Sequence, residues 1–143
     1  MIVPDVNLLL YATVTAFEQH PAARSWWQET LSGIEPVGLT APAVLGFVRI
    51  ATHRRVLTDP MPLSDARSTV QGWLNQPCVR FLRPGSLHLS EVLDLLESVG
   101  TAANLTTDAQ IAATAAEHRG TVHTADSDFA RFTGIAWTTP LAV

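Results

Sequence analysis

The chain alternates short apolar runs with helix-forming segments from one end to the other, and this alternation limits its fold more than any other feature. Residues 1–4 and 37–39 are short apolar runs typical of buried strands, residues 79–82 alternate like a strand, and 121–124 and 135–138 are the remaining strand candidates. The longer segments between them carry apolar residues at helical spacing. Strands separated by helices predict an α/β fold in which a parallel sheet is covered on both faces.

Six helices are expected around this sheet. Thr107 and Gln110 have the spacing of a capping box, which predicts a helix from Asp108 to about His118 that is closed by Gly120. The other five helices are expected at 6–13, 18–31, about 42–53, from 65 onward, and 86–98.

A single domain over residues 1–143 is expected, because this length suits one hydrophobic core. Hydrophobic residues make up 47% of the chain and charged residues 15%, which excludes an intrinsically disordered protein. No uncharged run is long enough to span a membrane, and the segment 1–5 lacks the basic residues of a secretory signal. The single cysteine, Cys78, excludes a disulfide framework and a cysteine zinc site. A cytoplasmic location without membrane contact is therefore expected.

All nine basic residues are arginine, and the chain has no lysine. This excludes a phosphate-binding loop ending in Gly-Lys, a Schiff-base lysine, and the lysine-dependent chemistry of receiver domains and haloacid-dehalogenase-like phosphatases. The net charge of −4 argues against a protein that coats nucleic acid by charge alone. It is compatible with an acidic active site that acts on nucleic acid.

Carboxylates follow two of the predicted strands at the point where each strand ends. Asp5 comes directly after the first strand, and Asp126 and Asp128 come after the fourth. In a parallel sheet, ligands bind beyond the carboxyl ends of the strands. Asp108 lies on the apolar side of its predicted helix, where a carboxylate has to be neutralised, paired or coordinated. A hard divalent cation would satisfy that requirement.

Each of these aspartates also has a purely structural explanation. An aspartate after a strand can cap a helix or form a turn, Asp108 in a first helical turn interacts favourably with the helix dipole, and residues 126–128 can form an Asx turn. The three remaining aspartates, Asp59, Asp65 and Asp94, fall in loops or on solvent faces. The gathering of the other four at one end of the sheet favours a shared functional site.

Three segments carry a recognisable pattern. Residues 2–9 read Ile-Val-Pro-Asp-Val-Asn-Leu-Leu, residues 105–113 read Leu-Thr-Thr-Asp-Ala-Gln-Ile-Ala-Ala with Glu-His-Arg-Gly at 117–120, and residues 122–129 read Val-His-Thr-Ala-Asp-Ser-Asp-Phe. In order, spacing and total length, the chain resembles the PIN domains, and most closely the VapC-type toxins of bacterial toxin–antitoxin pairs. The resemblance covers essentially the whole chain.

This resemblance implies a three-layer α/β/α fold and a ribonuclease that depends on Mg²⁺ or Mn²⁺. By position, the implied metal ligands are Asp5, Asp108 and Asp126. Asp128 is implied as a fourth catalytic carboxylate, which either binds the metal directly or contacts the residues that bind it. Hard cations take oxygen ligands, which agrees with a carboxylate cluster without His or Cys.

Supporting residues and partners are also implied by the resemblance. Asn7 and Thr124 would orient water and carboxylates. RNA is the implied substrate, an antitoxin protein the implied partner, and a homodimer the implied assembly. Arg49, Arg54 and Arg55 form a modest basic cluster that can hold RNA phosphate or can equally form a solvated helix end.

One position departs from the family pattern. The family pattern Glu-hydrophobic-Val-Arg begins with a glutamate. This chain has Gly-Phe-Val-Arg at 46–49, so a glycine stands in place of that glutamate. The missing acid leaves the number of bound metals open, and it gives an alternative function: a catalytically impaired PIN-like module that binds an antitoxin or RNA. The change Gly46→Glu is expected to suit a helical backbone and to tighten metal binding. A phosphatase built on Asp5 is disfavoured, because Asn7 stands where a second aspartate belongs and lysine is missing.

The four tryptophans have separate expectations. Trp26 and Trp27 are adjacent in a predicted helix and cannot both face one core, so one of them lies at a partner surface or is partly buried. Trp73 and Trp137 are expected in the core.

Overall fold

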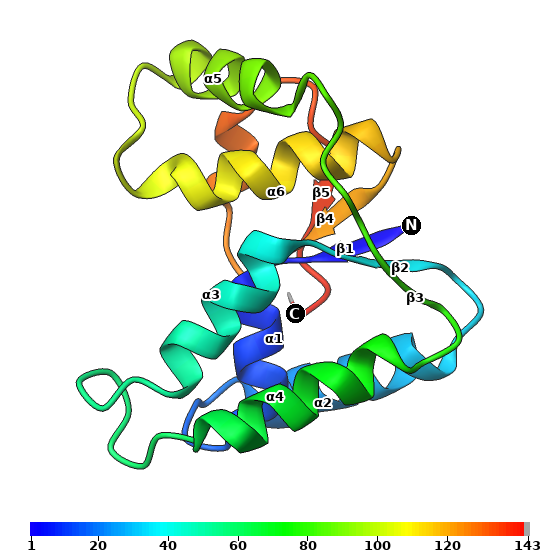
Figure 1. Cartoon of the computed structure of the whole chain (residues 1–143), viewed down its shortest axis with the longest axis vertical. Coiled ribbons are helices and arrows are strands. Elements are labelled where there is room, and N and C mark those ends of the chain that lie inside the picture. The colour runs from blue at the N-terminus through cyan, green and yellow to red at the C-terminus, as the bar shows by residue number, and fades with distance from the viewer. Residues whose placement is uncertain (142–143) are drawn as a thin grey trace.

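The computed structural model describes residues 1–141 and confirms the α/β class (Figure 1). Five short strands form one sheet in the order β3-β2-β1-β4-β5, and every neighbouring pair is parallel. The strands are β1 (Ile2–Pro4), β2 (Val37–Leu39), β3 (Val79–Phe81), β4 (Thr121–His123) and β5 (Trp137–Thr138). Each of them falls inside a run that the sequence predicts as a strand.

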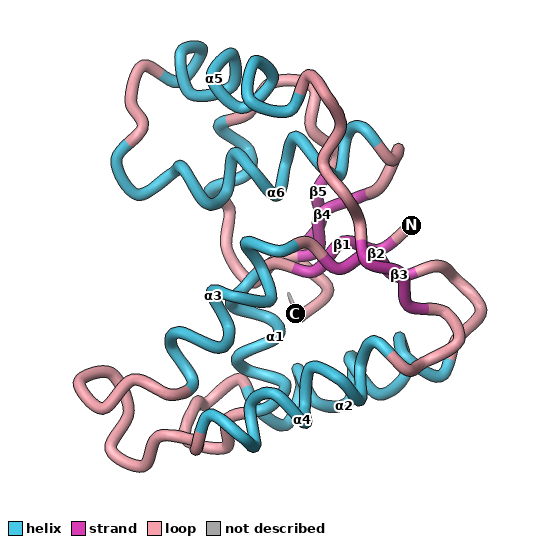
Figure 2. The backbone as a smooth tube through the Cα atoms, in the orientation of Figure 1, coloured by secondary structure: helices cyan, strands magenta, loops and turns pink. Residues whose placement is uncertain are grey.

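Helices cover the sheet on both sides, which gives the three-layer α/β/α arrangement that the resemblance implies (Figures 1 and 2). On one side lie α5 (His88–Val99) and α6 (Thr106–Glu117). On the other side lie α1 (Val6–Thr13), α2 (His20–Ser32) and α4 (Leu63–Leu74), and α3 (Ala41–Ala51) packs against α1, α4 and α6. Two single 3₁₀ turns complete the described part, η1 (Ala103–Leu105) and η2 (Asp128–Arg131). Among residues 1–141, no helix combines the length and the apolar composition needed to cross a bilayer.

The middle strand, β1, joins the first and last parts of the chain. Ile2 lies opposite Val37 of β2 on one side and opposite Thr121 of β4 on the other. All residues of β1 and β2 are buried. Burial on both faces of the sheet explains why these strands read as unbroken apolar runs instead of alternating patterns.

The start of α6 differs from the sequence prediction. The helix begins at Thr106, directly after η1, and the backbone of Leu105 is already helical. Thr107 therefore lies inside the helix and cannot act as its N-cap, because a capping residue needs extended backbone. Gln110 instead donates a hydrogen bond to the Thr106 carbonyl at 3.3 Å. The predicted capping box is wrong, and the helix begins two residues earlier than expected.

The tryptophans are mostly explained by packing within the chain. Trp27 and Trp73 are buried and meet edge to face with ring centroids 5.7 Å apart. Trp26 is half-buried and stacks on His123 of β4 at 5.9 Å. Trp137, which is expected in the core, packs against the core from a partly exposed position. Trp26 is therefore partly buried, which is one of the two alternatives that the sequence leaves open.

Candidate active site

Three neighbouring strands each end on a buried polar residue at the same edge of the sheet. Thr40 follows β2, Asp5 follows β1 and Thr124 follows β4, and none of the three is more than 4% exposed. Ligands of parallel sheets bind beyond this edge, and buried polar side chains there need partners. The edge is therefore the candidate active site.

Asp5 is fixed by three hydrogen bonds, one donated by its backbone N–H and one accepted by each of its carboxylate oxygens. Its N–H donates to the carbonyl of His123 at 2.9 Å, which ties the residue to β4. Its Oδ1 accepts the N–H of Val6 at 2.7 Å and caps α1. Its Oδ2 accepts the hydroxyl of Thr124 at 2.8 Å. The helix-capping explanation of Asp5 is thus correct, and the same carboxylate is also held at the strand ends.

Asn7 connects the strand ends with the loop that follows β4. Its Nδ2 donates to Thr124 Oγ1 at 3.3 Å and to Asp126 Oδ2 at 3.2 Å. Its Oδ1 accepts the N–H of Ala125 at 3.2 Å. Both polar atoms of the side chain are therefore in use, and Asn7 holds Asp126 in place beside Asp5.

Asp126 and Asp128 lie in a turn on the solvent side of the site. The N–H of Asp128 donates to Asp126 Oδ1 at 3.0 Å, so the Asx turn considered from the sequence is present. Both side chains are exposed, while Phe129 behind them is fully buried and anchors η2. The turn thus presents two carboxylates at the rim of the site.

Asp108 approaches the same edge from the first turn of α6. It is half-buried, and burial together with the charges of Asp5, Asp126 and Asp128 raises its pKa from 3.8 to about 7. Like charges act on a pKa in this way only when they are near. The four aspartates that the sequence singles out therefore lie near enough for their charges to interact.

Asp5 experiences the same crowding from inside the sheet. Burial raises its pKa to about 6, the hydrogen bonds from Thr124 and Val6 counteract part of that effect, and the charges of Asp126 and Asp128 add to it. At neutral pH the negative charges of these carboxylates repel one another, and a bound cation would relieve that repulsion.

The donor chemistry of this group fits a hard divalent cation, because every donor is an oxygen. Within residues 1–141, however, no three Asp, Glu, His or Cys side chains already surround one point closely enough to hold an ion. The expected convergence is therefore incomplete. Asp5 is held by its hydrogen bonds, so closing the site on an ion requires movement of the more exposed carboxylates.

Thr40 is a site residue that sequence analysis does not single out. Its hydroxyl accepts the N–H of Ala43 at 3.3 Å and caps α3. The available signal was its position directly after the 37–39 strand, which matches the position of Asp5 after β1 and of Thr124 after β4.

The arginine cluster lies at the other end of α3. Arg49 is exposed in the last turn of the helix, and Arg54 and Arg55 are exposed in the turn that follows it. The three arginines lie at the C-terminal end of α3, whereas Thr40 and the strand ends lie at its N-terminal end. Only a long molecule could contact the arginines and the candidate active site together.

Gly46 lies in α3 and faces α1 beside the site. A Cβ at this position would lie 2.8 Å from Cγ2 and 3.2 Å from Cγ1 of Val6, the residue that follows Asp5. Contacts this short do not persist without movement. The helical backbone at Gly46 has no positive φ and no neighbouring main chain in contact, so it suits Glu as expected, but the Val6 side chain has to move to make room.

Gly46→Glu is expected to lower the free energy of unfolding by about 1 to 3 kcal/mol, the usual effect of overpacking. Combining it with Val6→Ala should recover part of that loss, since the clashing methyl groups are removed. Urea unfolding of the two single variants and the double variant measures this coupling. Additive effects would show that positions 46 and 6 do not compete for space.

Comparison with known proteins agrees with this architecture. Residues 2–135 match the PIN domain family. Ribonuclease VapC33 of Mycobacterium tuberculosis is 52% identical over 141 residues, which cover 99% of each chain. Ribonuclease VapC37 of the same organism is 39% identical over 143 residues, which cover 100% of this chain and 99% of the relative.

Solved structures share the fold at much lower identity. The structure of VapBC-1 from nontypeable Haemophilus influenzae superimposes with a TM-score of 0.69 and 16% identity, covering 99% of this chain and 100% of that one. The structure of FitAB bound to a DNA fragment gives a TM-score of 0.67 and 18% identity, covering 100% and 97%. The sequence matches and the shared fold lead to one conclusion: the chain belongs to the PIN-domain family and, within it, to the VapC-type proteins.

Proposed function

We propose that this protein is a metal-dependent endoribonuclease and the toxin of a toxin–antitoxin pair. The observation that carries the proposal is the group of four aspartates at the carboxyl edge of the sheet, where mutual repulsion and burial raise the pKa of Asp5 and of Asp108. Relatives that span the full chain at 52% and 39% identity are named ribonucleases, which supports RNA as the substrate.

Asp5, Asp108 and Asp126 would hold Mg²⁺ or Mn²⁺, and Asp128 would act as the fourth catalytic carboxylate. When bound, such an ion activates a water for attack on the phosphodiester and neutralises charge on the phosphoryl oxygens. The protein supplies the positions: Thr124 and the N–H of Val6 hold the Asp5 carboxylate by hydrogen bonds.

Asn7 would keep Asp126 at the rim, within reach of the same ion, through its hydrogen bond of 3.2 Å. Arg49, Arg54 and Arg55 would contact RNA phosphates at a distance from the cut. Their charge would add to affinity in a salt-dependent way, without reading sequence.

The assembly and location belong to the same proposal. The protein would act as a single domain over residues 1–143, in the cytoplasm, as a homodimer inhibited by its antitoxin. Solved neighbours named VapBC-1, VapBC2 and FitAB support a toxin of a paired system, since each structure contains the fold described above.

Calorimetric titration with Mn²⁺, combined with a cleavage assay on structured and unstructured RNA, tests the proposal. Metal binding together with metal-dependent cleavage is the expected result. Metal binding without cleavage of any RNA would favour the alternative, a PIN-like module that lost catalysis with the glutamate at position 46. No binding of Mn²⁺ at millimolar concentration would contradict the assignment of the metal site.

A further inference from the structure

A cavity of about 460 Å³ opens beside the carboxylates. Four separate segments line it: Asn7 and Tyr11 of α1, Gln19 ahead of α2, Ala125, Asp126 and Ser127 after β4, and Thr139 and Leu141 after β5. Its volume is within the range of small-molecule sites. Because Asp126 belongs both to the cavity and to the group of aspartates, a molecule bound in one lies next to the other.

The cavity offers hydrogen-bonding groups that the fold leaves unused. The side-chain hydrogen bonds found among residues 1–141 do not involve the Tyr11 phenol, the Gln19 amide or the Ser127 hydroxyl, and Gln19 and Ser127 are exposed. Asn7 differs from them, because its donor and acceptor are both bound to the protein. The unused groups are therefore the ones available to a ligand.

Charge and shape restrict what that ligand can be. None of the described residues that line the cavity is cationic, and Asp126 adds a negative charge at its edge. A phosphate would be repelled there. Tyr11, whose ring packs against Phe17 at 5.1 Å, and Leu141 supply apolar walls. A neutral molecule with an apolar face and with donors and acceptors along its edge suits these lining residues.

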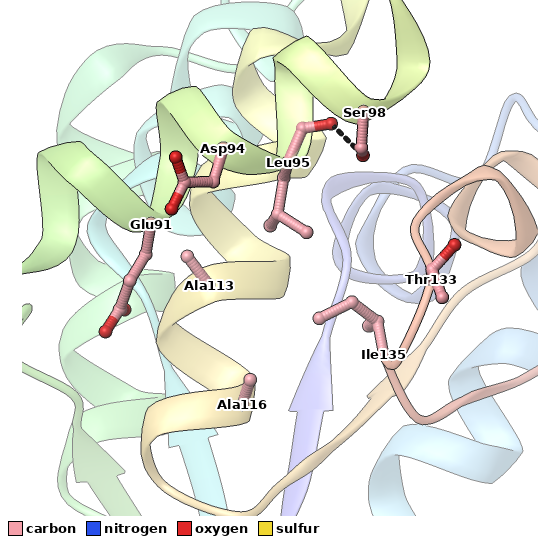
Figure 3. Close-up of a pocket in the computed structure, with 8 residues that line it drawn as sticks. All are labelled: Glu91, Asp94, Leu95, Ser98, Ala113, Ala116, Thr133 and Ile135. Carbon is pink, nitrogen blue, oxygen red and sulfur yellow. Dashed lines mark hydrogen bonds between the residues drawn. The ribbon is translucent and has the colours of Figure 1, made fainter.

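A second cavity, of about 340 Å³, serves as a comparison because it lies away from the four aspartates (Figure 3). It lies between α5 and α6, with Ala113 and Ala116 of α6 across from Leu95 and Ile135. None of the four aspartates of the candidate active site is among its described lining residues. A molecule bound there would not be positioned for reaction at Asp5.

We propose that the cavity beside Asp126 holds an unpaired nucleobase of the RNA, next to the phosphodiester that reaches the aspartates, and that Gln19 and Tyr11 select the base. The inference rests on the proposed ribonuclease function. Proteins read single-stranded RNA by placing splayed bases against aromatic side chains and bonding to their edges. The Gln19 amide presents a donor and an acceptor side by side, which matches the edge of a base.

Binding of the base can be measured without any cleavage. Adenosine, guanosine, cytidine and uridine are titrated separately into ¹⁵N-labelled protein without metal, with ribose as the matched control. Chemical-shift changes are expected at the Gln19 side-chain amide and at the backbone amides of Ala125 and Ser127, for at least one nucleoside and not for ribose. No shift at these groups with any nucleoside would overturn the assignment.

Selection of the base is measured with a randomised single-stranded RNA pool, sequenced after cleavage in Mn²⁺. Gln19→Ala should reduce the preference for the favoured base by about tenfold, because it removes a pair of hydrogen bonds between the amide and the base edge. Gln19→Glu should shift the preference toward guanine, whose N1–H and N2–H donors match two acceptors. Gln28→Ala, an exposed glutamine that lines another cavity, should leave the preference unchanged.

The two measurements separate the two hypotheses. If the unmodified protein leaves the pool intact, the ribonuclease function fails, and the nucleoside titration still decides whether the cavity binds a base. If the pool is cut with the same base frequencies by the unmodified protein and by Gln19→Ala, the cavity is not the selecting site. Tyr11→Phe, which keeps the ring, should retain more of the preference than Tyr11→Ala.

Discussion

Replacing Asp5 by Asn is expected to lower RNA cleavage by about a hundredfold or more while leaving the metal-free protein at least as stable. The amide has the same shape, and its oxygen can still accept the N–H of Val6, as Asp5 Oδ1 does at 2.7 Å. It lacks the negative charge that a divalent ion requires. Because the buried charge of Asp5 is unfavourable in the metal-free state, its removal also relieves repulsion.

Initial cleavage rates in Mn²⁺ and urea unfolding in EDTA check the two parts of this prediction. Asp59→Asn, at an exposed loop position, is the matched control and should change neither quantity. An Asp5→Asn protein that is unfolded, or that is several kcal/mol less stable, would mean that Asp5 serves as a structural cap. In that case its role in the active site would have to be withdrawn.

The metal-free protein is expected to lose stability as pH rises from about 4 to about 7. In the unfolded chain Asp5 and Asp108 titrate near 3.8, whereas in the fold their pKa values are about 6 and about 7. Between these values the folded state binds more protons, so the free energy of unfolding falls with pH. For buried Asp5 the shift of about two units corresponds to about 3 kcal/mol.

Urea unfolding in EDTA at several pH values measures this slope. Burial lowers the pKa of His123, which acts in the opposite direction, so the informative quantity is the difference between the unmodified protein and Asp5→Asn. The difference should grow in favour of the variant as pH rises and should shrink when Mn²⁺ is added. A difference that is independent of pH would show that Asp5 titrates normally.

The central strands β1 and β2 could be predicted from the sequence because all of their residues are buried. An unbroken apolar run of three or four residues, followed by a helical pattern, has few other interpretations. The ends of elements were harder to predict. Thr107 and Gln110 satisfied the spacing of a capping box, yet η1 brings helical backbone as far as Leu105 and removes the extended residue that a cap needs.

The site was predictable to the extent that its residues directly follow strands. Asp5, Thr124 and Asp126 could be found in this way, and Asp108 followed from its helical face. Contacts between distant segments were not predictable. The limited space for a side chain at position 46 depends on how α3 crosses α1, and the cavity at Gln19 depends on where the residues after β5 return. Neither leaves a periodic signal in the sequence.

The position of β1 has a consequence for biosynthesis. Asp5 is synthesised well before its partners, the carbonyl of His123 on β4 and the hydroxyl of Thr124 directly after that strand. At roughly 5 to 20 residues per second, about 6 to 24 seconds separate them. During that time β1 lacks one of its two neighbouring strands. Until β4 has been synthesised, the chain therefore lacks an assembled site.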